Sequence, residues 1–351
     1  MTLVSWIILS IVACIAAVGL YYLFPKSKKD TKQLYTEALE SFIRGDKEKA
    51  FRNLRELVKV DSNHVTAYII LGDILRQTQK PQQAVKIHQS LTARPKLTPS
   101  QTIDIYSSLA KDHFSLKQLD IAEEKANQVY LLDKKNQWAI KFLINLSEER
   151  ESWDNASIYL KRLEKLTNKN EPKRHAYYRV MQGRSFEKDQ KYHEARAAYQ
   201  KAIHTDKGYS EAYLHMANLY QKESNLKKAV EFWTRFAELS PVGGTEIFSK
   251  LEKALYDLGQ FGRVEDFYSK IIDKNPNNIE ALSGLINVLQ AKGQIDRAMT
   301  LVDEALHKNS KSVHARLARL KLSLGRINEN QLSSEVDQIR ELINEGNGSY
   351  L

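Results

Sequence analysis

The sequence has few of the residues that build disulfides, thiolate metal sites or irregular loops. Its 351 residues include one cysteine, Cys14. One cysteine cannot form an internal disulfide, and without a C-x-x-C pair the chain lacks the usual thiolate ligands and redox dithiols. Only 7 prolines and 14 glycines interrupt the chain, and its abundant Leu, Ala, Lys, Glu and Gln favour helices. These scarcities predict a mostly helical protein with no metal and no cofactor.

The charged residues are mixed in sign, although the formal net charge is +10. A basic balance can indicate nucleic acid, an anionic membrane surface or acidic partners. Here basic and acidic residues alternate over short distances, as in KDHFSLKQLDIAEEK at 111–125. We therefore interpret the charges as solvated helix faces and expect no nucleic-acid partner.

The first 25 residues, MTLVSWIILSIVACIAAVGLYYLFP, carry no charged side chain. As a helix, residues 3–24 would span about 33 Å at about 1.5 Å per residue, close to the roughly 30 Å hydrocarbon core of a bilayer. Tyrosines and a tryptophan near the two ends suit the membrane interfaces, and basic residues follow Pro25. The sequence thus predicts a single-pass inner-membrane anchor at 1–25 and a basic juxtamembrane linker at 26–33. The positive-inside rule puts the N-terminus in the periplasm and the remainder in the cytoplasm.

Two alternatives to an anchor are a cleaved signal peptide and a lipoprotein signal. The segment Ile11-Val12-Ala13-Cys14 is similar to a lipidation site. A signal peptide, however, begins with basic residues and its apolar region stops at the cleavage site. This segment has no basic start, and ten apolar or small residues follow Cys14. The anchor is therefore favoured, and a periplasmic lipoprotein or enzyme is kept as an alternative.

A small residue recurs along the rest of the chain at intervals of 34 to 39 residues. Residues of a buried type follow each of these marker residues after four and seven positions, as one stripe of a helix requires, with His88 in this place four positions after Ala84. In five of eight repeats another small residue lies twelve positions earlier, which would let two antiparallel helices approach closely. The markers, which we expect to pack the repeats, are Ala50, Ala84, Ala122, Ala156, Ala195, Ala229 and Ala298, with Val264 as the seventh in chain order.

This pattern resembles the tetratricopeptide repeat, a stack of helix pairs with a period of about 34 residues. We expect an all-α solenoid of about eight helix pairs at 34–310. Insertions at 93–100 and 167–175 would be longer turns or kinks, and Gly45, Gly259 and Gly293 fall in the turns within pairs. Residues 311–351 would supply two capping helices, at 311–326 and 331–345, and a tail.

The sequence offers no convincing catalytic motif. HEARA at 193–197 begins like a zinc-protease helix but lacks the second histidine, and no G-x-S-x-G is present. We expect no enzyme activity and look instead to the concave surface that the first helix of each pair lines in a solenoid. This groove could bind an acidic or amide-rich peptide through charge-assisted hydrogen bonds, or its residues could form a solvated helix face. The groove residues are Asp73, Arg76, Gln77, Arg184, Lys188, Asn218 and Lys222.

One segment, at 67–133, is more specific than a generic repeat. It carries L-G-x-x-x-R at 71–76, I-H-Q-x-L at 87–91, Leu97-Thr98, and Asp112 followed by Asp120, Ala122 and Glu123. These residues, with Gly72, His88 and Gln89 as the signature, resemble the lipopolysaccharide assembly protein B family of Gram-negative bacteria. That resemblance implies a membrane-anchored adaptor that brings the committed-step deacetylase of lipopolysaccharide synthesis to a membrane-bound ATP-dependent protease.

The sequence departs from this family in one respect. Family members end in a rubredoxin-like metal domain with two C-x-x-C pairs, whereas no cysteine follows Cys14 here. We expect that domain to be lacking, which puts the proteolytic mechanism in doubt. A generic membrane-tethered scaffold for a secretion, pilus or division complex is the alternative function. For His88 the alternatives are a hydrogen-bonded core histidine and a direct ligand contact.

Overall fold

The computed structural model describes residues 30–240, 243–276, 278–324, 326 and 328–347. The predicted anchor at 1–25 lies outside these residues, as does the first half, 26–29, of the predicted linker at 26–33. Within the described ranges, no helix is both long enough and apolar enough to cross a membrane. All regular structure in these ranges is helical, which confirms the predicted all-α class.

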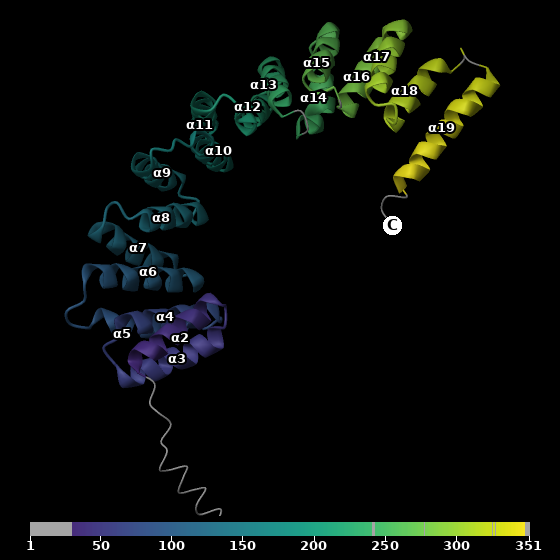
Figure 1. Cartoon of the computed structure of the whole chain (residues 1–351). Coiled ribbons are helices and arrows are strands. Elements are labelled where there is room, and N and C mark those ends of the chain that lie inside the picture. The colour runs from purple at the N-terminus through teal and green to yellow at the C-terminus, as the bar shows by residue number, and fades with distance from the viewer. Residues whose placement is uncertain (1–29, 241–242, 277, 325, 327, 348–351) are drawn as a thin grey trace, which may run out of the picture. The chain divides into compact units, whose positions relative to one another are not determined.

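The chain divides into two compact units, which we call unit 1 (up to Asn168) and unit 2 (from Lys169). Unit 1 consists of four antiparallel helix pairs, and successive pairs pack against each other (Figure 1). Its helices are α2 (Thr31–Ile43), α3 (Lys47–Val60), α4 (Val65–Gln77), α5 (Pro81–Thr92), α6 (Pro99–Ser115), α7 (Leu119–Leu132), α8 (Gln137–Glu149) and α9 (Trp153–Thr167).

Unit 2 continues the same plan with four further repeats and a final helix pair. A short 3-10 helix, η1, precedes the first helix of the third pair. The elements are α10 (Pro172–Lys188), α11 (Tyr192–Thr205), α12 (Ser210–Lys222), α13 (Leu226–Leu239), η1 (Gly243–Ile247), α14 (Phe248–Asp257), α15 (Phe261–Lys274), α16 (Ile279–Ala291), α17 (Ile295–Lys308), α18 (Val313–Ser323) and α19 (Glu329–Asn347). The last two helices cover the region for which the sequence predicts a cap.

The marker residues lie in the second helix of each of the eight repeats and are fully buried. All eight, Val264 included, are 0% exposed. A side chain this small lets the two helices of a pair approach, while larger residues one turn away fill the sides of the contact. In α3, for example, Leu54 and Leu57 are buried beside Ala50. The core therefore runs along the axis of each stack.

Every repeat makes its inner turn in the same way. The residue five positions before each marker has a positive φ angle, between 54° and 82°. Glycine occupies this position in three repeats, where it removes the steric cost of the left-handed conformation. In the other five the residues are Gln79, Lys117, Glu151, Gln190 and Ser224. The helix pairing therefore imposes this conformation even where the residue type does not favour it.

Each of the two insertions is followed by a lengthened first helix, and residues 93–98 also form a longer connection than residues 61–64 between α3 and α4. The first helices α6 and α10 are 17 residues long, whereas α4, α8 and α12 have 13. Each long helix begins with proline at its first turn, which suits a position that needs no N–H donor. Thr98 and Gln101 form a capping box at the start of α6. One additional helical turn thus absorbs most of each insertion.

Candidate functional site

In four repeats, one core position of the second helix is occupied by an aromatic side chain with a polar atom. This position lies four residues after the marker and is occupied by His88, Tyr199, Trp233 and Tyr268, all of them buried. A buried polar atom needs a hydrogen-bond partner, and each of these rings finds one on the first helix of its own pair. The partners are the Ile69 carbonyl and the side chains of Glu187, Asn218 and Glu252.

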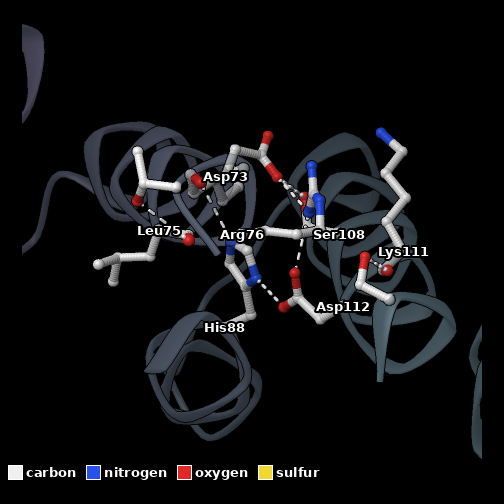
Figure 2. Close-up of polar contacts among 10 residues, drawn as sticks. Asp73, Leu75, Arg76, His88, Ser108, Lys111 and Asp112 are labelled. Atoms are coloured by element: carbon white, nitrogen blue, oxygen red, sulfur yellow. Dashed lines mark hydrogen bonds and ion pairs between the residues drawn. The ribbon is translucent and has the colours of Figure 1, made fainter. Parts of the chain in front are cut away.

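His88 is fully enclosed. Both His88 and Asp112 are 0% exposed. His88 Nε2 lies 3.0 Å from the carbonyl oxygen of Ile69, and Nδ1 lies 2.5 Å from Asp112 Oδ2 (Figure 2). Because a carbonyl oxygen can only accept, Nε2 must carry a proton. The remaining contact is a charge-assisted hydrogen bond in which His88 and Asp112 share one proton.

The contacts of Asp112 extend this pair into a network across three helices. Asp112 Oδ1 accepts from Arg76 Nη1 at 2.9 Å, and the same Nη1 lies 2.7 Å from Asp73 Oδ1. Ser108 Oγ donates to Asp73 Oδ1 at 3.2 Å. Two carboxylates thus face one guanidinium and one histidine proton, which balances the buried charge. The network joins α4 and α5 of the second repeat to α6 of the third.

Serine, histidine and aspartate meet in this network, but not as a nucleophilic triad. A hydrolase needs a histidine nitrogen that can take the proton of the serine. Here Ser108 donates to Asp73, while both nitrogens of His88 are engaged by Ile69 and Asp112. The histidine is also closed to solvent. The geometry therefore makes His88 a hydrogen-bonded core residue that holds helices together.

Gly72 provides the space that the ring of His88 occupies. A Cβ atom added at Gly72 would lie 2.3 Å from His88 Nε2 and 2.5 Å from Cε1. Gly183 stands in the same relation to Tyr199, where the closest approach would also be 2.3 Å. The glycine and the ring are thus complementary in both repeats. Gln89, the third signature residue, is exposed on α5.

The predicted groove residues of unit 1 differ in their exposure. The side chains of Asp73 and Arg76 are 23% and 13% exposed and belong to the buried network. Gln77 follows them at the end of α4 and is exposed. Of these three residues, Gln77 is the one that the fold leaves most accessible to a partner.

In unit 2 the predicted groove residues cluster around Glu187. Lys222 Nζ lies 2.6 Å from Glu187 Oε2, and Tyr199 donates its hydroxyl to Glu187 Oε1 at 2.5 Å. Asn218 accepts at Oδ1 from Trp233 Nε1 at 3.1 Å, which orients its amide group so that the NH2 points away from the indole. Arg184 and Lys188 are exposed on α10, which packs against α12. We call Arg184, Lys188, Asn218 and Lys222 the unit 2 polar surface.

The ionisation of this cluster follows from burial and from Glu187. Burial raises the pKa of Tyr199, and its hydrogen bond to Glu187 raises it further. The hydrogen bond to Glu187 also raises the pKa of Lys222. His215 stacks on Tyr199 with ring centroids 5.4 Å apart, and burial lowers the pKa of His215, with Arg184 acting in the same direction. At neutral pH His215 is therefore uncharged, and Lys222 remains a cation.

Sequence patterns did not identify Glu187, His215 or the role of Asp112. Their contacts join residues 12 to 36 positions apart, such as Tyr199 with Glu187 and Arg76 with Asp112. One signal was available: a histidine or tyrosine at a core position requires a nearby polar partner. Within the described ranges, no three His, Cys, Asp or Glu side chains are grouped so that they could hold a metal ion.

Two family models match parts of unit 2. Residues 180–242 and 255–321 each match a family model described as tetratricopeptide repeat. A solved structure of the C-terminal part of a TPR repeat-containing protein from Cytophaga hutchinsonii covers 72% of this chain and 99% of that chain. Its sequence identity is 14% and its TM-score is 0.42.

Two curated relatives carry the same name. Lipopolysaccharide assembly protein B of Escherichia coli K12 is 20% identical over 275 residues, which are 78% of this chain and 70% of that protein. The protein of that name from Haemophilus influenzae is 24% identical over 244 residues, or 69% of this chain and 61% of that protein.

The helix pairs and their markers form a tetratricopeptide-repeat-like solenoid, and two stretches of unit 2 match family models of that repeat. Within this class the chain is similar to lipopolysaccharide assembly protein B, as the signature residues predicted. The similarity extends well beyond the 67–133 segment that first indicated it.

Proposed function

We propose that this chain is a non-catalytic adaptor in the regulation of lipopolysaccharide synthesis and assembly. It binds protein partners through the first helices of its repeats. The observation that carries this proposal is the unit 2 polar surface, where cationic side chains lie beside an oriented amide group. Arg184 and Lys188 are exposed on α10, and they can donate to carboxylates and backbone carbonyls of an extended acidic segment.

The described helices suit the chain to contact with partners. His88, Ser108 and Asp112 are buried and bonded to other groups, so this constellation of catalytic residue types is closed to substrates. Repeat proteins of this kind present an extended surface on a rigid stack, which favours recognition of a partner segment.

The more specific role proposed here is the one that the resemblance to the lipopolysaccharide assembly protein B family implies. We propose that the chain is held at the cytoplasmic face of the inner membrane by residues 3–24 and brings the deacetylase of the committed step to a membrane-bound ATP-dependent protease. Anchoring raises the effective concentration of the adaptor beside membrane partners without new contacts. If another envelope complex is the partner, the same surface would serve a scaffold for secretion, pilus or division proteins.

Site-specific photo-crosslinking in living cells tests this proposal. A photoreactive residue at Arg184 or Lys188 on α10, or at Gln77 on α4, should capture the deacetylase or the protease. Lys201 is a matched control, because it is exposed on the second helix α11 of the same pair, and it should capture neither. Capture of a different envelope complex would favour the scaffold. Equal capture at Lys201 would contradict a first-helix binding surface.

A further inference from the structure

A groove of about 360 Å³ lies in unit 1 where α3 meets the ends of α4 and α5. Its apolar lining, which we call the floor, consists of Phe51, Ile74 and Leu75, of which Ile74 and Leu75 are 2% and 6% exposed. Lys47, Arg52 and Lys80 are its cationic lining residues. Glu48 and Thr78 complete the lining. The volume falls within the range of about 300 to 1,000 Å³ that is typical of ligand-binding clefts. We call this site the basic groove. It shares no residue with the unit 2 polar surface.

The three cations of the basic groove have no carboxylate partner within the part of the chain that the structure describes. Arg52 and Lys80 are exposed. Three cations and one carboxylate, Glu48, leave two net positive charges around an apolar floor. Elsewhere on the surface cations commonly pair across helices, as Lys222 does with Glu187 and Lys292 with Glu265.

Two of these cations also stand where the helices themselves do not favour them. Lys47 is the first residue of α3, and Lys80 is the N-cap residue of α5, where it makes no side-chain capping hydrogen bond. The N-terminus of a helix carries a partial positive charge, so the charge of a lysine there is unfavourable. A bound anion beside these positions would remove that repulsion.

We propose that the basic groove binds an acidic protein segment that carries a large apolar side chain. The apolar side chain rests on Phe51, Ile74 and Leu75, and flanking carboxylates pair with Arg52, Lys80 and Lys47. The cations come from two different helices and surround the floor, which suits several carboxylates spaced along a peptide better than one lipid headgroup. The proposal does not depend on the function proposed for unit 2.

Fluorescence anisotropy on the full chain tests the proposal with a defined probe. The probe is a labelled peptide with a central leucine–phenylalanine pair flanked on each side by three acidic residues. The double variant Arg52→Glu/Lys80→Glu reverses two cations of the basic groove. The matched control, Lys49→Glu/Arg55→Glu, makes the same charge change at exposed positions of α3 outside the groove.

We expect the groove variant to weaken binding of the probe by about tenfold or more, which corresponds to about 1.4 kcal/mol. The control should weaken binding by only about twofold. Replacing the leucine–phenylalanine pair of the probe by serines should also weaken binding by about tenfold. Equal losses in both variants, or no effect of the serine replacement, would overturn the proposal. Absence of probe binding would also overturn the proposal. This includes the case in which the chain binds phosphatidylglycerol vesicles through Arg52 and Lys80 and does not bind the probe. All variants alter exposed residues, and an unchanged unfolding midpoint verifies their fold.

Discussion

The contact between Gly72 and His88 yields the sharpest prediction for the stability of unit 1. In the variant Gly72→Ala, the new Cβ would lie 2.3 Å from His88 Nε2. The ring cannot move away freely, because its two nitrogens are bonded to Ile69 and Asp112. Either α4 and α5 separate or the ring turns and leaves Asp112.

The magnitude follows from three terms. Overpacking a buried contact costs about 1–3 kcal/mol, and leaving a buried polar group unsatisfied costs about 1–3 kcal/mol. Alanine is favoured over glycine within a helix by about 0.5–1 kcal/mol, which offsets part of the cost. We therefore expect Gly72→Ala to lower the free energy of unfolding by about 2–4 kcal/mol.

Hydrogen exchange combined with urea unfolding provides the assay, because exchange reports on α4, α5 and α6 separately from the rest of the chain. Gly262→Ala in α15 is the matched control, since a Cβ there would meet nothing within 4 Å. It should leave stability unchanged or raise it by up to about 1 kcal/mol. In Gly72→Ala/His88→Ala the added methyl enters the space left by the ring, so the double variant should be no less stable than His88→Ala.

Two results would refute this reasoning. In the first, Gly72→Ala unfolds like Gly262→Ala, and α4 to α6 keep their protection. In the second, the effects of Gly72→Ala and His88→Ala add in the double variant, which would mean that the two side chains do not compete for space.

Three further predictions concern the turns, the buried pair and the response to pH. Gly259→Ala should cost about 1–2 kcal/mol in urea unfolding because its φ is +68°, although a Cβ there has open space; stability equal to wild type would contradict this. Asp112→Leu alone should cost about 3–5 kcal/mol, whereas His88→Leu/Asp112→Leu should unfold at nearly the wild-type urea midpoint, because it removes both charges. Burial lowers the pKa of His215. The contribution of neutral His215 to stability is therefore complete above the unfolded pKa of about 6.5 and is lost as the pH falls below that value. Thermal unfolding of His215→Gln between pH 8 and 5 should therefore depend less on pH than wild type, and an equal slope would contradict the assignment.

Much of the fold was predictable because each repeat follows a local rule. A marker residue with residues of a buried type four and seven positions later defines a helix stripe. This rule identified the second helix of each of the eight repeats. The turns were less accessible, since Gln79 and Lys117 adopt the left-handed conformation without the glycine that would signal it. The insertions became additional helical turns, which periodicity alone does not reveal.

The candidate sites were predictable only in part. Helical phase found residues on one face of the first helices, such as Arg76 and Lys222. Their partners, Asp112 and Glu187, are more than 30 positions away in sequence. These pairings depend on how successive helix pairs stack, which is a property of tertiary structure. The basic groove likewise requires three helices to be placed together.

The most direct test of the central claim measures the lifetime of the deacetylase in cells whose only copy of this protein is a variant. Arg184→Glu/Lys188→Glu changes the unit 2 polar surface, and Lys201→Glu/Lys227→Glu makes the same charge change on exposed positions of the second helices. We predict that the first variant leaves the deacetylase as long-lived as depletion of the protein does, while the second restores its turnover. Restored turnover with both variants, at wild-type protein levels, would contradict a contact through the first helices.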